Sequence, residues 1–247
     1  MRGLLLGAAA VVGGTLRSVA CTGISLSASD GSYVQARTIE WSHSPLKSEY
    51  VIIPRGEELR SYTPTGANGL KFKARYGVVG LAVVEREFIA EGVNESGLSA
   101  GLFFFPQYGS YAPYDATLAS VTLADLQVVQ WILTQFSTID QLKTAINDVR
   151  VVGLERSAVV HWRIGEPSGR QVVMEIVGGQ VNFYDNTVGV LTNAPGFPWH
   201  LANLSNYVNL RAGDAPSQVL GTQEVQPIGS SSAMLGLPGD FTPPSRF

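Results

Sequence analysis

The chain contains a single cysteine, Cys21. A lone cysteine forms no disulfide within its own chain, so it is a buried inert thiol, a lipid-attachment site or a reactive nucleophile. As the first residue of a processed chain, it would carry a thiol and an α-amino group with a pKa of about 8, which accepts the thiol proton. A nucleophile of this kind needs no histidine or aspartate partner. The residues that precede Cys21 bear on which of the three roles applies.

Residues 1–20 have the pattern of a secretory signal peptide. An apolar run over residues 4–12 follows a positive charge, and the small residues Ser18 and Ala20 stand at the positions that favour cleavage before Cys21. We therefore expect a mature protein in the periplasm or secreted. No run approaches the roughly 20 apolar residues that a membrane span needs. Ser18 to Cys21 also loosely resembles a lipoprotein cleavage box, so a lipid-anchored binding protein is the alternative.

Composition excludes several other kinds of partner. The only histidines are His43, His161 and His200, and neither they nor Cys21 have the spacing of metal ligands, so we expect no metal and no cofactor. The formal net charge is −3 and the 17 Lys and Arg residues are scattered. Without a basic stripe, nucleic acid is not an expected partner.

The elements that must position Cys21 read as strands, then helices, then strands. In a chain of 247 residues, 45% of them hydrophobic, this order predicts one α+β domain. A hairpin is expected over residues 22–28 and 33–38, and two amphipathic helices over residues 123–133, with Thr122 as N-cap, and 137–147. Further strands are expected over residues 50–54, 76–84, 102–105, 158–164, 171–177, 180–185 and 188–192, and a short helix over 200–210.

Short motifs in series add a resemblance. Cys21-Thr22-Gly23, followed by Arg37-Thr38-Ile39-Glu40-Trp41, is similar to the mature start of the choloylglycine hydrolases, which include bile salt hydrolases and penicillin V acylases. Further matches run in order to the last residue: Gly92 to Leu98 (GVNESGL), Leu191 to Pro195 (LTNAP), Trp199-His200, Leu237 to Thr242 (LPGDFT) and Ser245 to Phe247 (SRF). The resemblance implies an N-terminal nucleophile hydrolase with an αββα sandwich over residues 21–247.

The resemblance also assigns roles to individual residues. Cys21 would be the nucleophile, Arg37 would lie beside its thiolate, and Glu40, where the family usually has Asp, would hold the α-ammonium group. The oxyanion donors would be the Asn193 side chain and the backbone N–H of Phe104. Arg246 would match the family's second active-site arginine, and the acyl pocket would be lined by Trp41, Phe103 and Phe105.

The expected function is an exported cysteine amidase that acts on a small N-acyl amide. Penicillin V, N-acyl homoserine lactones and conjugated bile salts fit this description, and the Glu40-Trp41 pair favours the first two. The alternative is a lipid-anchored or inactive protein that binds acyl amides, with Cys21 modified. Family members are often tetrameric, which makes a homotetramer the candidate assembly. They also continue beyond the position of Phe247, so we expect the usual C-terminal portion to be lacking and part of a sheet to be uncovered.

Overall fold

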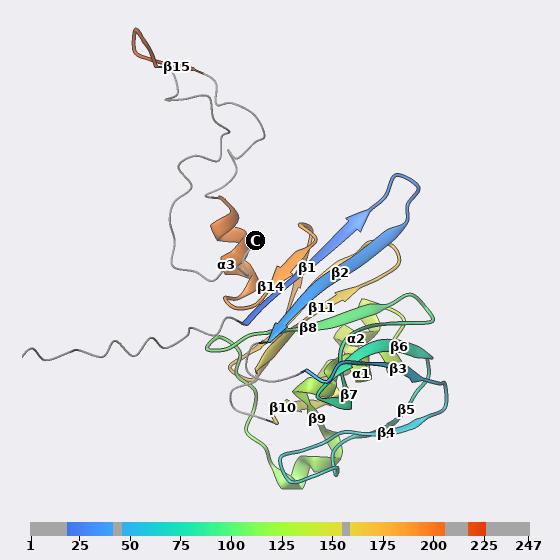
Figure 1. Ribbon diagram of the computed structural model, residues 1–247. Helices are drawn as coiled ribbons and strands as arrows, with labels where there is room; N and C mark the ends of the chain where they lie inside the picture. The colour runs from blue at the N-terminus through green and yellow to red at the C-terminus, as the bar shows by residue number, and fades with distance from the viewer. Residues whose placement is uncertain (1–18, 42–45, 155–158, 206–216, 226–247) are drawn as a thin grey trace, which may run out of the picture.

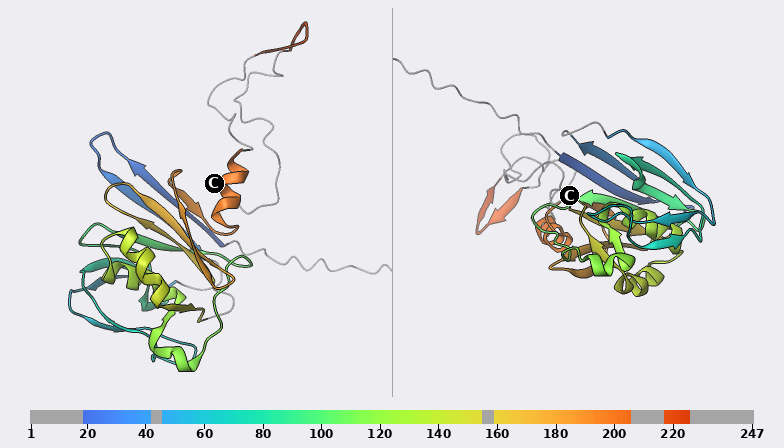
Figure 2. Two further views of the ribbon diagram at one scale, coloured as in Figure 1. Left: turned by 180° about the vertical axis from the view of Figure 1, so that it is seen from behind. Right: turned by 90° about the horizontal axis from the view of Figure 1, so that it is seen from below.

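The computed structural model describes residues 19–41, 46–154, 159–205 and 217–225, and the structural statements below concern these residues. Two antiparallel sheets face each other, and the helices α1 and α2 cover the outer face of the larger sheet (Figures 1 and 2). The larger sheet has seven strands in the order β13-β12-β11-β8-β7-β6-β3, and the smaller has three in the order β14-β1-β2. These strands are β1 (Val19–Ser27), β2 (Tyr33–Trp41), β3 (Glu49–Ile53), β6 (Val78–Val83), β7 (Glu85–Asn94), β8 (Ser99–Phe104), β11 (Val160–Gly165), β12 (Gln171–Val177), β13 (Gln180–Asp185) and β14 (Val190–Thr192).

The expected hairpin is present as β1 and β2. Its register pairs Cys21 with Ile39 and Gly23 with Arg37. Because side chains alternate along a strand, these four residues share one face of the hairpin, and this face is turned toward the larger sheet. The hairpin therefore carries the lone cysteine into the space between the two sheets.

Alternation along β8, β11 and β12 separates two apolar clusters. Ala100, Trp162 and Met174 point toward the helices and belong to the main core. Phe103 and Val173 point the other way and pack with Cys21 in a smaller cluster between the sheets. Since both faces of these strands are covered, β11 is buried along its whole length. The layer between the sheets is where the chemically active side chains lie.

The helical region differs in part from its sequence pattern. Residues 122–124 form a short strand, β9 (Thr122–Ala124), which pairs in parallel with β10 (Arg150–Val152). The expected N-cap at Thr122 is therefore wrong: the chain continues through η2 (Asp125–Gln127), and α1 (Val128–Gln135) begins later than predicted. The apolar residues at 123 and 126 matched a helical period although they precede the helix. The second helix, α2 (Ile139–Ala145), is capped by the Thr138 side chain and leads into η3 (Ile146–Asp148).

The remaining elements complete the periphery. The helix expected over residues 200–210 is present as α3 (Phe197–Leu204), which begins earlier, at a Gly-Phe-Pro sequence. The polar segment after β3 contains the hairpin of β4 (Glu58–Arg60) and β5 (Lys71–Lys73), which its turn-rich composition did not predict. Further short elements are η1 (Ala116–Val121), β15 (Gln218–Leu220) and β16 (Gln223–Val225).

The smaller sheet covers only part of the larger one. Above β3, β6 and β7 the described residues leave apolar side chains exposed, among them Tyr50, Ile52, Val79 and Val93. Within the described chain, β2 forms the edge of the three-stranded sheet on this side. None of the described helices has the length and apolar character needed to cross a membrane.

Candidate active site

Cys21 and Arg37 lie close together on the inner face of the β1–β2 hairpin. Both are covered: Cys21 is 5% exposed and the Arg37 side chain 6%. The Arg37 guanidinium interacts electrostatically with the Cys21 side chain. Burial lowers the pKa of Arg37 and the interactions with Cys21 and Glu91 oppose this effect. A cation held beside a thiol favours its thiolate form, which is the nucleophilic one.

The Arg37 guanidinium is fixed by the larger sheet below it. Its Nη1 donates hydrogen bonds to the carbonyl oxygens of Ala90 (3.2 Å) and Leu102, and its plane lies over the ring of Phe103, with Cζ 4.2 Å from the ring centroid. Cation–π contacts of this kind add most where water is excluded. Arg37 thus joins the two sheets beside Cys21, which lies on β1 of the smaller sheet.

Two charged residues that the sequence analysis missed complete this cluster. The Arg163 side chain, on β11, is fully buried, and its Nη2 lies 3.0 Å from Glu91 Oε1. Glu91 Oε2 lies 3.8 Å from Arg37 Nη1. Burial raises the pKa of Glu91, against the lowering effect of the two arginines. One signal for Arg163 was present in the sequence, since an arginine inside an apolar strand run is rarely buried without a partner.

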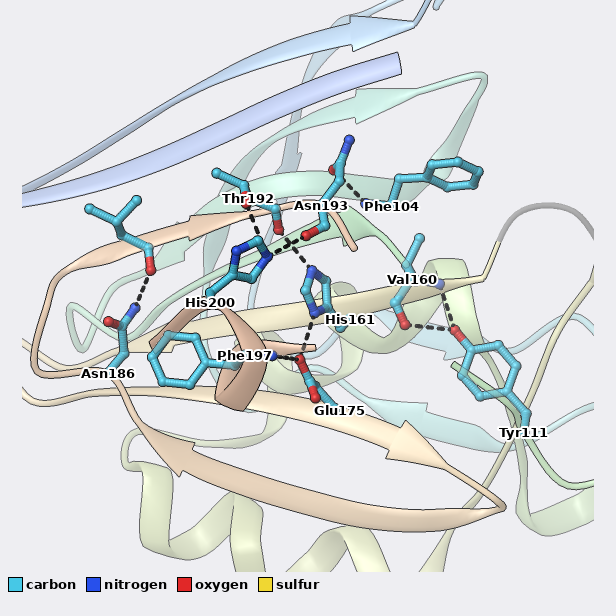
Figure 3. Close-up of polar contacts among 11 residues, drawn as sticks. Phe104, Tyr111, Val160, His161, Glu175, Asn186, Thr192, Asn193, Phe197 and His200 are labelled. Carbon is cyan, nitrogen blue, oxygen red and sulfur yellow. Dashed lines mark hydrogen bonds and ion pairs between the residues drawn. The ribbon is translucent and has the colours of Figure 1, made fainter. Parts of the chain in front are cut away.

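Asn193 and Phe104, the two expected oxyanion donors, are neighbours. The backbone N–H of Phe104 donates to Asn193 Oδ1 over 3.0 Å (Figure 3). The N–H of Ala194 donates to the Phe104 carbonyl. Asn193 follows β14, in which Thr192 pairs with Thr22, the residue after the cysteine. Strand pairing therefore brings this pair beside β1.

A buried polar network supports the segment that carries Asn193. His161 Nδ1 lies 3.1 Å from Glu175 Oε1, and His161 Nε2 lies 2.9 Å from the carbonyl of Thr192 (Figure 3). His200 Nε2 lies 3.0 Å from the Asn193 carbonyl oxygen. Both ring nitrogens of His161 are thus occupied by structural partners, and the network fixes the backbone around Asn193.

The aromatic run packs inside the protein. Phe103 lies in the cluster with Cys21, and Phe105 stacks on His161 with ring centroids 4.3 Å apart. Both are buried, so neither lines the groove of about 720 Å³ that opens between β2 and the uncovered strands. Its described lining includes Arg37 and Glu91 with Ile39, Tyr50, Leu81 and Val93. The groove reaches the charged cluster from the open side.

Glu40 and Trp41 lie at the end of β2. Glu40 is exposed and, by strand alternation, points away from the face that carries Cys21 and Arg37. The structure therefore does not bring its side chain to the thiol face, although Glu40 lies directly opposite Ala20 in the hairpin. Trp41 ends the strand, and its side chain lies outside the described part of the structure.

Comparison with known sequences adds the family. A sequence model described as "Linear amide C-N hydrolases, choloylglycine hydrolase family" matches residues 21–247. The chain belongs to the choloylglycine hydrolase family. The resemblance read from the short motifs is thereby confirmed, and with it the class of enzyme, a hydrolase of linear amide C–N bonds.

Relatives in the choloylglycine hydrolase family cover most of the chain. A bile salt hydrolase/transferase of Clostridium perfringens is 32% identical over 234 residues, which are 92% of this chain and 69% of the relative. A penicillin V acylase of Pectobacterium atrosepticum is 26% identical over 205 residues, 76% of this chain and 53% of the relative. The chain thus spans between about half and 69% of these relatives.

Solved structures agree on the fold. A mutant of the conjugated bile acid hydrolase from Clostridium perfringens superposes with a TM-score of 0.72 at 31% identity, over 91% of this chain and 69% of that one. Penicillin V acylase from Agrobacterium tumefaciens shares the fold with a TM-score of 0.65. The expected α+β sandwich of N-terminal nucleophile hydrolases is confirmed, and the described residues show its two sheets and one covering helix layer.

Arg246, the expected second active-site arginine, lies outside the described residues. Among the residues that the structure describes, no group of three or more His, Cys, Asp or Glu side chains is arranged to hold a metal ion.

Proposed function

We propose that this protein is exported, loses residues 1–20, and hydrolyses the linear amide bond of a small N-acyl substrate with Cys21 as the nucleophile. The observation that carries the proposal is that Cys21 and Arg37 lie on the same face of the β1–β2 hairpin, both buried between the two sheets. A buried cation–thiol pair has a plain catalytic use, because the thiolate is both stabilised and shielded from bulk water. The neighbouring Asn193–Phe104 pair offers amide donors within reach of the same strand.

The reaction would proceed by two acyl transfers. The thiolate of Cys21 attacks the amide carbonyl carbon, and the tetrahedral intermediate collapses with loss of the amine, which takes its proton from the α-ammonium group of Cys21. Water then attacks the thioester carbonyl with the α-amine as base, which releases the carboxylic acid and restores the thiol. Each step moves one proton through the same terminal amine.

Glu40 would act on that amine rather than on the thiol. Cleavage after Ala20 would leave the new terminus next to the cross-strand position of Glu40, because Ala20 and Glu40 are paired in the hairpin. A carboxylate at this place favours the ammonium form by charge. We therefore propose Glu40 as the partner of the α-ammonium group on the outer face of β2.

The oxyanion would be bound by the Asn193–Phe104 pair. The Phe104 N–H donates to Asn193 Oδ1 in this structure, so a substrate oxyanion would replace this acceptor. The Asn193 amide N–H₂ group would then supply the second donor. Donors fixed in advance in a water-poor site are worth several kcal/mol of transition-state stabilisation, of the order of 3 kcal/mol per donor.

The proposed substrates share an apolar acyl group and an amide. Relatives of this chain are named as bile salt hydrolases and as a penicillin V acylase, and the sequence at Glu40-Trp41 favours penicillin V and N-acyl homoserine lactones. The groove beside Arg37 has mainly apolar walls, which suits an apolar acyl group. A panel of these three amides therefore covers the proposal.

The test follows export and turnover in the same preparation. The full chain is expressed in a bacterium, and the exported product is analysed by intact mass and N-terminal sequencing. We expect a chain that begins with unmodified Cys21 and that releases amine from at least one of penicillin V, an N-acyl homoserine lactone or a conjugated bile salt. Cys21→Ser should lower the rate to background while it leaves the thermal unfolding temperature near that of the wild type.

Two outcomes would count against the proposal. Equal rates for the wild type and Cys21→Ser on every substrate would exclude Cys21 as the nucleophile. A retained leader, or a lipid on Cys21, would block the α-amine and support the anchored binding protein instead.

A further inference from the structure

One row of residues crosses the larger sheet directly below the hairpin. Glu91 on β7 lies opposite Gly101 on β8, and Gly101 lies opposite Arg163 on β11. Since Gly101 has no side chain, the outer two residues meet above it, with Arg163 Nη2 3.0 Å from Glu91 Oε1. A Cβ atom on Gly101 would stand 1.9 Å from Glu91 Oε2. The contact between the carboxylate and Arg163 therefore depends on a glycine at this position.

A second glycine makes the matching space in the hairpin. Gly23 lies opposite Arg37, and a Cβ atom on Gly23 would stand 2.7 Å from Arg163 Nη1. Arg163 uses this space to donate from Nη1 to the carbonyl of Ile24 over 3.1 Å. The buried arginine thus ties the larger sheet to β1, the strand that carries Cys21.

Glu91, which pairs with Arg163, also lies close to Arg37. Its Oε2 has no hydrogen-bond partner among the described residues and lies 3.8 Å from Arg37 Nη1. Arg37 also donates to the carbonyl of Ala90, the residue before Glu91. The backbone of this stretch of β7 therefore holds the guanidinium, and the Glu91 carboxylate lies beside it without a hydrogen bond to it.

The charges in this cluster do not balance. Arg37 and Arg163 supply two positive charges and Glu91 one negative charge, and all three side chains are wholly or largely buried. Glu91 lies nearer to Arg163, at 3.0 Å, than to Arg37, at 3.8 Å, so Arg163 takes up most of the carboxylate charge. Unbalanced buried charge is costly, and a thiolate at Cys21, which interacts electrostatically with Arg37, would balance it.

We infer that Glu91 and Arg163 are positioning residues that set the charge available at Arg37: Arg163 pairs with Glu91 and so leaves the positive charge of Arg37 uncompensated for the Cys21 thiolate. The carbonyl oxygens of Ala90 and Leu102 hold the guanidinium in place, and Arg163 is the counter-charge that prevents Glu91 from neutralising it. The inference rests on the proposed function only for the role of the thiolate as nucleophile. The arrangement of the charges is independent of any substrate.

The lone cysteine permits a direct test, because alkylation of the full chain reports on Cys21 alone. The rate of reaction with iodoacetamide is measured against pH by intact mass, which gives the pH midpoint of alkylation. Arg163→Gln frees Glu91 to neutralise Arg37 and should raise the midpoint by about one pH unit. Glu91→Gln removes a negative charge and should lower the midpoint by a similar amount.

The double variant Glu91→Gln/Arg163→Gln separates this inference from a purely structural role. It removes a neutral pair, so its midpoint should return to within a few tenths of a pH unit of the wild type. Structural damage would instead move all three variants in one direction and most strongly in the double variant. The matched control is Asp140→Asn/Arg170→Gln, which removes an exposed ion pair far from Cys21 and should leave the midpoint unchanged.

The outcomes remain informative if a variant is unstable. Glu91 is partly exposed, so Glu91→Gln is the variant best placed to fold, as circular dichroism would verify. A midpoint that rises or stays unchanged in folded Glu91→Gln would overturn the inference. Opposite shifts in the single variants without hydrolysis of any amide would support the positioning role and count against the proposed function. Hydrolysis of an amide together with unshifted alkylation midpoints in the variants would support the proposed function and count against the positioning role.

Discussion

The larger sheet has one half beneath the three-stranded sheet and another half, toward β3 and β6, that is left uncovered, and one row of residues runs through both. From Val173 through Arg163 to Gly101 the row lies beneath the three-stranded sheet, and the side chains of Val173 and Arg163 are fully buried. The same row continues through Leu81 to Tyr50, which is 87% exposed. The opposite faces of all these strands are equally buried against the helix layer. The difference therefore lies in the cover and not in the strands.

The covered half is the more polar of the two. Between the sheets it holds charged and polar side chains, namely Arg163, His161 and Glu175, whereas the open half displays Tyr50, Ile52, Val79 and Val93. Packing alone would favour the reverse arrangement. Polar groups under this cover interact strongly because water does not screen them.

The largest expected effect comes from removing an aromatic ring from each half. Phe103→Ala takes away a fully buried ring between the sheets and should lower the free energy of unfolding by about 3–5 kcal/mol. Tyr50→Ala removes a ring from the same face of the same sheet and should change it by about 0.5 kcal/mol or less. Urea unfolding followed by circular dichroism measures both. Similar losses in the two variants would show that the open half is covered in solution.

A smaller and more closely matched comparison uses two valines. Val173→Ala in the covered half should cost about 2 kcal/mol, since two buried methyl groups are lost. Val79→Ala in the open half should cost about 0.5 kcal/mol or less, because Val79 is 47% exposed. The same unfolding experiment applies. A larger loss at Val79 than at Val173 would reverse the comparison.

The smallest expected effect is the contribution of His200 to the loss of stability at acidic pH. Burial lowers the pKa of His200 from its ordinary value of 6.5, against the raising effect of the Asn193 carbonyl. In the window between the two values the unfolded chain binds a proton that the folded chain does not. Stability from this group is therefore fully present above pH 6.5 and is lost as the pH falls below it.

A variant isolates this contribution from the carboxylates. The loss of unfolding free energy between pH 7.5 and pH 5.5 should be smaller in His200→Gln than in the wild type, as measured by urea unfolding at each pH. An equal loss in both proteins would indicate that this histidine is as accessible to protons when folded as when unfolded.

The sequence predicted the helices and strands better than the contacts between segments that are distant in the chain. The hairpin around Gly31, the strands after residue 158 and the helix capped by Thr138 follow local rules of alternation, turns and capping. Thr122 is not an N-cap because its segment forms a strand that pairs with the distant strand β10. Tertiary pairing of this kind leaves no mark in a short window of sequence.

Local sequence patterns predicted the candidate site only where two residues belong to one hairpin, whereas the neighbouring Asn193 and Phe104 were expected from the family resemblance alone. Cys21 and Arg37 are brought together by a single turn, so their relation was readable from the chain. Glu91 and Arg163 meet across β8, and their contact depends on a sheet order that local patterns do not specify. Phe103 and Phe105 were assigned to a pocket because an aromatic run reads alike whether it lines a cavity or fills a core.

The paired position of Ala20 has a consequence for the order of events in the cell. The peptide bond between Ala20 and Cys21 lies inside β1 and is held in register against Ile39 and Glu40. A peptidase takes its substrate as an extended segment that is free of other partners, so this bond is protected whenever the end of the hairpin is closed. The proposed cleavage before Cys21 would then compete with closure of the hairpin, and a chain that folded first would be cleaved only as fast as the strand end opens.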